Sequence, residues 1–449
     1  MIARNFNEDP TLPESVVPGT RKHLLVVSSV WPHVEGSFEA ANVVVHSVVA
    51  EIAAAGEFDL SYAYVNAQPV QIPPQAEPDL AKLRAAGVSF LDPLLLPPPS
   101  FLRERPFAFI KALFVKPESI LFGHDAGHML RARAQRQVDA VLTIWTEIGL
   151  NAASHVGTLR FAYHGNPDHK VFDAQHEVMR LVGAAPRGLR GAVDRLRRGL
   201  LRSLLERAHL TMLRRYTFVA DIAANDATYY ASRGINAFYL ANMWPMSPPA
   251  DWEARRDTLE ASNPGKIIGS VGNLSATGNS LGFIALGKEV LPALERKLKP
   301  NSFKIHIFGG REPKPFLKPL LAHPAILVRG FVDDLNAEII SAPIFLISNN
   351  HHNFKVSHTR FLHAWSLGAC VVAFRDCRDA MPEIEHGHNA LLGDTAEQVA
   401  ALVAQAMKDR ELRRRLGRGG IETLQQKFSP ATVTRTLIER MKAAGLSKG

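Results

Sequence analysis

GKIIGSVGNL (265–274) joins an apolar run to a glycine loop, and a helical pattern follows from Ser280 to Leu298. A near-continuous apolar run bounded by polar residues is typical of a buried strand in a parallel sheet. KIHIFGG (304–310) repeats the strand and the glycine loop. Three more apolar runs follow, separated by short helical segments: AILVRGFV (325–332), APIFLIS (342–348) and ACVVAF (369–374). This alternation predicts an α/β fold with a doubly wound sheet.

The N-terminal half alternates in the same way. KHLLVVSSV (22–30) is an apolar run, Phe38 to Ala55 has helical spacing, and FDLSYAYV (58–65) follows as a second strand. Residues 66–118 are rich in proline and poorly periodic, so we expect long connections there, with a short helix and strand near 79–91. Further predicted strands are AVLTIW (140–145), RFAYHG (160–165), TFVADIAAN (217–225) and FYLANMWP (238–245).

A proline-rich break, PMSPPADWE (245–253), separates the two series and marks the expected domain boundary. We therefore predict two Rossmann-like domains that face a cleft. The first covers residues 1–244 and the second covers residues 245–425. For the last segment, 426–449, we predict a C-terminal helix and consider a return of that helix to the first domain.

The composition limits the classes of partner. The 449 residues include 52 Lys and Arg against 43 Asp and Glu, a net charge of +9, which favours phosphorylated ligands, anionic lipids or nucleic acid. Nucleic acid is not expected, because no recognition motif is present and aromatic residues do not interleave with the basic runs. No segment has the length and apolarity of a membrane span, and the first residues lack a secretory signal. Two cysteines, Cys370 and Cys377, favour a reducing cytoplasm.

Residues 187–216 are predicted to form a basic amphipathic helix. Nine arginines fall between Arg187 and Arg215, against only two acidic residues, Asp194 and Glu206. Apolar residues recur three or four positions apart: Leu189, Val193, Leu196, Leu200, Leu204 and Ala208. Either this helix docks on an anionic membrane surface, or it packs on the protein with a solvated basic face.

Ligand sites of open parallel sheets lie at the carboxyl ends of the strands. In the N-terminal half, the loop VWPHVEGSFEAAN (30–42) places Gly36 before a helix whose first amides could bind a phosphate or an acceptor. An ordinary tight turn explains this glycine equally well.

Three loops in the C-terminal half together indicate a nucleotide cleft. SVGNLSATGNSLG (270–282) lies between a strand and a helix and lacks the Gly-Lys-Ser/Thr triplet of a Walker loop. FGG (308–310) and RGFV (329–332) end the next two strands. Small residues at such ends let a phosphate approach backbone amides. The candidate binding residues in these loops are Gly272, Asn273, Gly309, Gly310 and Phe331.

The richest segment is SNNHHNFKVSHTRFLHAWSLGACVVAF (348–374). Arg360 and His363 are three residues apart, so they share a helix face and could hold a diphosphate and a ribose. A solvated helix start without a ligand is the alternative. A zinc site is not expected, because His351, His352 and His358 match no standard spacing and no Cys or acidic ligand lies beside them.

His164 ends a predicted strand in FAYHGNPDH (161–169). A histidine at a strand end that faces the cleft could contact sugar hydroxyls or a leaving oxygen. A buried structural histidine is the alternative at this position.

The C-terminal half resembles the nucleotide-sugar-dependent glycosyltransferases of the two-Rossmann GT-B type, specifically the large retaining family 4 (glycosyltransferase group 1). The first half is similar more loosely, through the strand, glycine loop and helix at 23–55, His164, and YLANMWP near the usual strand-ending Asn. The stretches that carry the resemblance are IIGSVGNL, NSLGFIALGKEVLPAL, FKIHIFGG, ILVRGFVDDL, APIFLIS, TRFLHAWSLGACVVAF, MPEIEHGHNALL and GDTAEQVAALVAQAM.

The resemblance implies that a nucleotide-sugar binds the second domain and a glycan, lipid-linked or protein acceptor binds the first. It implies transfer in the cleft with no cofactor and no dissociable metal. Arg360 stands where the family has a Lys or Arg for the leaving diphosphate, and His363 where it has a Glu for the ribose hydroxyls. His164 aligns with the sugar-contacting, catalytic His, and Glu383 with a Glu of the turn before the last strand.

The sequence departs from the family at the acidic pattern. The two glutamates of the family would fall at positions 355 and 363, which are Lys355 and His363 here. Two hypotheses follow. One is an active, retaining hexosyltransferase of surface polysaccharide or glycoconjugate biosynthesis, cytoplasmic and in contact with a membrane. The other is a degenerate GT-B scaffold that binds without transfer.

Overall fold

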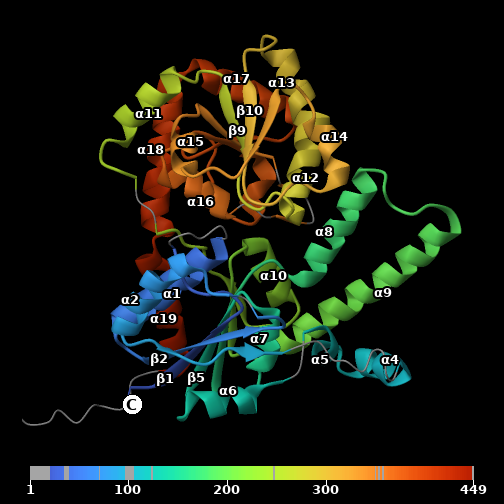
Figure 1. Cartoon of the computed structure of the whole chain (residues 1–449), viewed down its shortest axis with the longest axis vertical. Coiled ribbons are helices and arrows are strands. Elements are labelled where there is room, and N and C mark those ends of the chain that lie inside the picture. Colours follow the sequence, from blue (N-terminus) through green and yellow to red (C-terminus); the bar gives the residue numbers. More distant parts are fainter. Residues whose placement is uncertain are drawn as a thin grey trace, which may run out of the picture.

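The computed structural model describes residues 21–34, 40–69, 71–96, 106–122, 125–245, 248–348, 350–351, 354–355 and 358–446. Each half of the chain builds one parallel sheet covered by helices (Figure 1). The predicted α/β class with two Rossmann-like sheets is therefore confirmed. No described helix combines the length and apolar character that a membrane crossing needs.

The N-terminal sheet has eight strands in the order β3-β2-β1-β5-β6-β7-β8, with β4 paired to β2. All of its pairs are parallel, and β1 is fully buried because both faces of the sheet are covered. The strands are β1 (His23–Ser28), β2 (Asp59–Asn66), β3 (Ser89–Phe90), β4 (Leu94–Leu95), β5 (Ala140–Ile144), β6 (Leu159–His164), β7 (Phe218–Asp221) and β8 (Ala237–Tyr239).

The C-terminal sheet has six parallel strands in the order β11-β10-β9-β12-β15-β16. A separate antiparallel pair, β13 (Asn350–His351) and β14 (Phe354–Lys355), follows β12. The strands of the main sheet are β9 (Lys266–Ser270), β10 (Lys304–Phe308), β11 (Ile326–Gly330), β12 (Ile344–Ile347), β15 (Val371–Phe374) and β16 (Leu391–Gly393).

The helices of the N-terminal half partly differ from the prediction. Residues 66–118 hold more helix than expected, because α4 follows the predicted short helix α2 and strand β3. The strand predicted at 217–225 ends at Asp221, and the one at 238–245 ends at Tyr239. The helices are α1 (Ala40–Ala55), α2 (Glu77–Ala85), α4 (Pro106–Val115), α5 (Pro117–Leu121), α6 (Gly127–Ala134), α7 (Glu147–Ala152), α8 (Asp168–Leu181), α9 (Gly188–Leu213) and α10 (Ala224–Ser232).

The predicted helix from Ser280 to Leu298 is present but contains a π-helical turn, Leu286–Val290, between α12 and α13. The C-terminal helix predicted within 426–449 is α19, and two further helices, α17 and α18, precede it. The helices of this half are α11 (Trp252–Ala261), α12 (Thr277–Ala285), α13 (Leu291–Lys297), α14 (Lys318–Leu321), α15 (Leu335–Ile340), α16 (His358–Ser366), α17 (Ala396–Lys408), α18 (Arg410–Lys427) and α19 (Pro430–Ala443).

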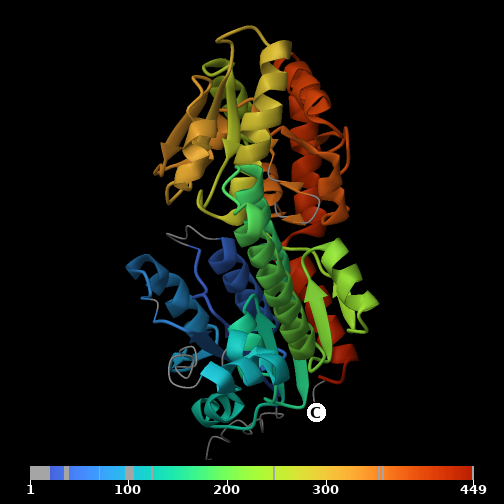
Figure 2. The same ribbon diagram turned by 90° about the vertical axis from the view of Figure 1, so that its right-hand side faces the viewer.

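Two helices each pack against the half of the molecule to which they do not belong by sequence (Figures 1 and 2). Helix α8 belongs to the N-terminal half, yet its Ala174 and Val178 are buried in the core of the C-terminal sheet, and it packs on α12. Helix α19 lies at the end of the chain and packs on α1, with Leu437 and Met441 buried in the N-terminal core. Both helices therefore add apolar contacts between the halves.

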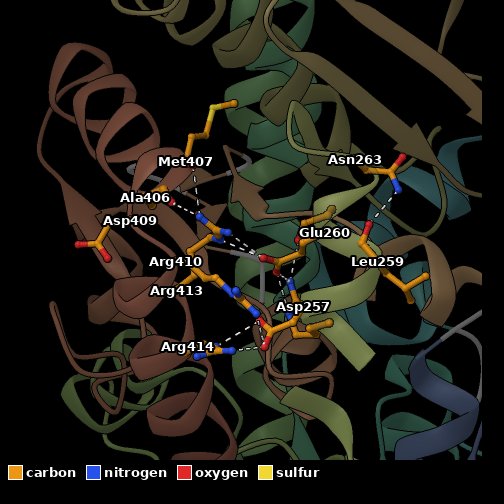
Figure 3. Close-up of polar contacts among 12 residues, drawn as sticks. Asp257, Leu259, Glu260, Asn263, Ala406, Met407, Asp409, Arg410, Arg413 and Arg414 are labelled. Atoms are coloured by element: carbon orange, nitrogen blue, oxygen red, sulfur yellow. Dashed lines mark hydrogen bonds and ion pairs between the residues drawn. The ribbon is translucent and has the colours of Figure 1, made fainter. Parts of the chain in front are cut away.

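An ion-pair network fastens α11, the first helix after the proline-rich break, to α18 (Figure 3). The buried Arg256 donates to Glu260, and Arg413 of α18 contacts the other oxygen of that carboxylate at 3.0 Å. Arg410 and Arg414 of α18 both bind Asp257, at 2.6 Å for Arg410. These two arginines lower the pKa of Asp257 to about 2.

Candidate functional site

A pocket of about 720 Å³ lies between the two sheets. The N-terminal half lines it with Val34, from the loop after β1, with Ala40 and Val43 of α1, and with Trp244. The C-terminal half lines it with the turns after β9, β10 and β11 and with one side of α16. Seven of the residues predicted from sequence line this pocket: Gly272, Asn273, Gly309, Gly310, Phe331, Arg360 and His363.

The glycine turns after β9 and β10 touch one another. Gly309 has a φ of +150°, and a Cβ atom built on it would lie 1.7 Å from the carbonyl oxygen of Gly272. The amide of Gly309 also donates to the carbonyl of Gly330 at 2.8 Å. Position 309 must therefore be glycine for these strand ends to meet. The close approach leaves a floor of backbone rather than side chains in the pocket.

Helix α12 begins at Thr277, directly after the first glycine turn, and points its N-terminus at the pocket through Ala276 and Asn279. Its N-cap residue, Ala276, makes no side-chain hydrogen bond to the amides of the first turn. Free amides and the positive end of the helix dipole favour an anion. This end of the pocket can therefore accept a phosphate group.

Arg360 supplies a cation to the same end. Its Nη2 donates to Asn279 Oδ1 at 2.8 Å, and its Nε donates weakly to the carbonyl of Val271 at 3.4 Å. Burial lowers the pKa of Arg360 to about 10, so the guanidinium remains charged at neutral pH. No carboxylate of the described residues pairs with it. The charge is consequently available for an anionic ligand.

Asn279 holds that arginine in place, although the sequence reasoning did not select it. Its Oδ1 also accepts from Ser270 Oγ at 2.7 Å, and its Nδ2 donates to the carbonyl of Asn273 at 2.7 Å. Each polar atom of the buried amide is thus used, and the first glycine turn, α12 and Arg360 are joined through one side chain. The available signal was its position at the start of a helix that follows a glycine loop.

His363 lies one turn further along α16. Its Nε2 is 2.7 Å from Asn336 Oδ1, and its ring centroid is 5.4 Å from that of Trp244. Burial lowers the pKa of His363 to about 4, so the ring is neutral at neutral pH. If Nε2 donates to Asn336, Nδ1 is unprotonated and can accept a hydrogen bond from a ligand hydroxyl.

Trp244 is the second pocket residue that the sequence reasoning missed. It is 7% exposed, and its indole Nε1 has no hydrogen-bond partner among the described residues. Its backbone amide donates to the carbonyl of Phe428, which anchors the end of the N-terminal domain beside α18. An aromatic residue directly before the proline-rich break was the only sequence signal.

Glu383 is not brought into this group. Glu383 follows β15 and accepts from Tyr239 Oη of β8 at 2.8 Å, so it lies at a contact between the halves and does not line the pocket. Burial and this carboxylate raise the pKa of Tyr239. Gly36 falls outside the described residues, as do the side chains of Lys355 and His358.

His164 ends β6 and does not line the pocket either. It is 1% exposed, and neither ring nitrogen has a hydrogen-bond partner among the described residues. Its Nε2 is 3.9 Å from Glu147 Oε1, and its ring centroid is 4.8 Å from that of His209. Burial and His169 lower the pKa of His164 to about 4. The end of β6 thus holds a neutral, buried imidazole whose two nitrogens have no hydrogen-bond partner in the described part of the chain.

Acidic residues surround that histidine at neighbouring strand ends. Burial and then the Asp168 charge raise the pKa of Glu147 to about 8, and burial raises the pKa of Asp168 to about 6. At the end of β7, burial and then Asp226 raise the pKa of Asp221 well above its usual range. Within the described ranges, no group of three or more His, Cys, Asp or Glu side chains is arranged to hold a metal ion.

Comparison with known proteins concerns a segment of the C-terminal half that contains the glycine turns and Arg360. Residues 265–409 match the family model described as glycosyl transferases group 1. This segment is a group 1 glycosyltransferase domain. No curated protein matches the chain by sequence.

Solved structures resemble nearly the whole chain at low sequence identity. HepE of Anabaena, solved with UDP and glucose, has 12% identity and a TM-score of 0.56 over 94% of this chain and 100% of its own. Sucrose-phosphate synthase of Thermosynechococcus elongatus has 14% identity and a TM-score of 0.58 over 94% and 100%. Trehalose 6-phosphate synthase of Burkholderia multivorans has 13% identity and a TM-score of 0.57 over 95% and 100%. The chain therefore has the GT-B fold.

Proposed function

We propose that the protein is a glycosyltransferase that moves a sugar from a nucleotide-sugar to an acceptor, with the donor in the 720 Å³ pocket. One observation carries this proposal. The turns after β9, β10 and β11 meet helices α12 and α16 in one pocket. That pocket presents the N-terminal amides of α12 and an arginine that no carboxylate of the described residues pairs. Those groups match a diphosphate in charge and in hydrogen-bonding capacity.

The chemistry assigned to the pocket is stabilisation of a leaving nucleoside diphosphate. The bond between the anomeric carbon of the sugar and the diphosphate breaks, and negative charge develops on the phosphate oxygen that leaves. Arg360 and the first amides of α12 are fixed before the reaction, so they stabilise that charge without reorganisation. His363, neutral and held against Trp244, would bind ribose hydroxyls. We further propose that transfer needs no resident metal or cofactor, so EDTA should leave the rate unchanged.

The acceptor side of the proposal is the buried polar cluster at the ends of β5, β6 and β7. His164 is the proposed catalytic residue, because neither ring nitrogen has a hydrogen-bond partner among the described residues. Its low pKa keeps the ring neutral, able to accept or donate one hydrogen bond. A role in binding the transferred sugar implies that His164→Ala lowers kcat/KM, whereas His164→Asn recovers part of the loss through its amide.

The finer assignments are also proposals. HepE was solved with UDP and glucose, which supports a UDP-hexose as the donor. The resemblance to family 4 supports retention of stereochemistry. A glycan or lipid-linked acceptor of surface polysaccharide or glycoconjugate synthesis, used at the cytoplasmic side of a membrane, is compatible with the basic charge of the chain.

A ligand screen tests the proposal. The melting temperature of the full chain is measured with UDP-, GDP- and dTDP-sugars, because a ligand that binds only the folded state raises it by mass action. We expect one nucleotide class to raise it in the wild type and to have little effect in Arg360→Ala. No stabilisation by any nucleotide-sugar, with no release of nucleotide in the presence of acceptors, would contradict the proposal.

A second candidate, a GT-B protein that binds but does not transfer, is favoured by one observation. The described residues that line the pocket include no glutamate, and His363 occupies the ribose position of the family. Binding of a nucleotide-sugar without hydrolysis or transfer would select this candidate. Replacement of His363 by Glu tests the ribose contact in both candidates, because it should raise donor affinity if His363 contacts the ribose.

A further inference from the structure

The N-terminal half of α9 exposes a row of large apolar side chains. Leu189, Val193, Leu196 and Leu200 are 83%, 61%, 78% and 48% exposed. They are separated by four, three and four positions, so they lie in one stripe along the helix. The C-terminal half of the same helix differs, because Leu204, Ala208, Met212 and Leu213 are buried. The stripe therefore has no covering element among the described residues.

This end of α9 projects from the body of the molecule (Figure 1). Helix α5 packs on the opposite, buried end of α9, where Glu118 pairs with Arg215 at 2.8 Å. We call Leu189, Val193, Leu196 and Leu200, together with Arg190 and Arg197 beside them, the α9 surface.

The charge around the stripe is positive. Arg187, Arg190, Arg195 and Arg197 are exposed, and none of them forms an ion pair with a described residue. The one acidic residue between Arg187 and Leu200, Asp194, is paired with Arg198 at 3.0 Å. On a helical projection, Arg190 and Arg197 lie beside the stripe. Further along the helix, Arg202 is paired with Asp173 and Glu206.

We propose that the α9 surface docks on an anionic lipid bilayer, with its apolar side chains at the boundary of headgroups and acyl chains. Helices that lie in a membrane interface combine an apolar stripe with flanking basic residues that attract anionic lipids. A second copy of this chain fits less well, because pairing two identical stripes would bring the unpaired arginines against one another. Docking of this kind goes beyond sugar transfer and does not depend on it.

Vesicle binding tests the docking. The full chain is sedimented with vesicles of phosphatidylcholine alone and with vesicles that contain roughly a third phosphatidylglycerol, at low and high salt. Two double variants are compared with the wild type: Leu189→Gln with Leu196→Gln, and Arg190→Gln with Arg197→Gln. Leu95→Gln is the matched control, because Leu95 is an exposed leucine on β4, away from this surface. No nucleotide-sugar is present, so the result is independent of the proposed function.

We expect the wild type and the control to bind the anionic vesicles and to lose binding at high salt. The leucine variant should bind at least about tenfold more weakly, since each buried leucine is worth more than about 1 kcal/mol. The arginine variant should lose about fivefold per residue, since a basic residue near the surface contributes about 1 kcal/mol. Absent binding to anionic vesicles, or equal binding by all variants, would overturn the proposal. The proposal would also be overturned if the leucine variant lost self-association in sedimentation velocity but bound vesicles as the wild type does.

Discussion

Asn279 shows how a single side chain can organise a charged site. Its amide joins Ser270, the carbonyl of Asn273 and Arg360, so the arginine is fixed before any ligand arrives. The two glycine turns beside it leave the backbone exposed to the same space. Fixed charge and bare backbone amides are the features that a diphosphate requires.

The contact between Gly309 and Gly272 gives a prediction at this scale. Gly309→Ala should destabilise the glycosyltransferase domain by more than about 2 kcal/mol, because the new Cβ would overlap the Gly272 carbonyl and the positive φ disfavours an alanine. Urea unfolding measures the effect. Gly310→Ala is the control, because nothing lies within 4 Å of its Cβ position. Equal stability of the two variants would show that the turns do not meet as described.

Glu147 gives a prediction about pH. Its pKa is raised to about 8 in the folded state, so folding takes up a proton and the free energy of unfolding falls as pH rises from about 4.5 to 8. Glu147→Gln removes this dependence. It should raise the free energy of unfolding at pH 9 by roughly 1–3 kcal/mol and change it little at pH 4.

Thermal or urea denaturation across this pH range measures the difference. Glu439→Gln, at an exposed position of α19, should leave the pH profile unchanged. A Glu147→Gln profile parallel to that of the wild type would mean that Glu147 is ionised in the folded protein.

At the scale of elements, the ion pairs between α11 and α18 connect the start of the C-terminal half to its end (Figure 3). The glycines of α18 allow this helix to lie close to its neighbours. A Cβ at Gly420 would meet the Trp365 ring at 2.4 Å, and one at Gly417 would meet the Gly368 carbonyl at 2.4 Å. Since α19 follows α18 directly, the position of α18 also sets where the chain returns to α1.

Asp257→Asn tests the contribution of this network. The folded-state pKa of Asp257 is lowered to about 2, so its stabilisation is present above pH 4 and is lost as pH falls through 2. The variant should lose about 1–2 kcal/mol at pH 7, measured by urea unfolding, and the difference from the wild type should shrink toward pH 2. Asp92→Asn, at an exposed position, should show no loss. A constant difference at all pH values would assign the effect to packing instead.

At the scale of the molecule, α8 and α19 each cross from one half to the other (Figure 2). The donor pocket lies between the halves, so these helices fix its width along with the linker. Sequence patterning predicted the alternation of strands and helices well, because buried parallel strands are long apolar runs. The pattern did not predict that α8 packs on the C-terminal core, because the apolar residues of α8 are compatible with packing on either sheet.

Part of the site could also be predicted from the sequence. The glycine turns at strand ends and Arg360 can each be recognised within one short segment, and the sequence predicted them. Trp244 and Asn279 enter the pocket through contacts between segments far apart in the chain, with Asn279 and Arg360 separated by 81 positions. Helix α4 was missed because its residues lie in a proline-rich stretch without polar periodicity. The domain limits at 244 and 425 and the role of Glu383 stay predictions.

A calorimetric titration with the nucleotide-sugar that gives the largest thermal shift tests the central claim, that Arg360 holds a diphosphate in the pocket. The account predicts one site per chain, a loss of about 10–100-fold in affinity for Arg360→Ala, and a smaller loss for Asn279→Ala, since a charge-assisted hydrogen bond contributes about 1.5–3 kcal/mol. Arg255→Ala, an exposed arginine of α11 outside the pocket, should bind as the wild type does. Unchanged affinity in Arg360→Ala would contradict the account.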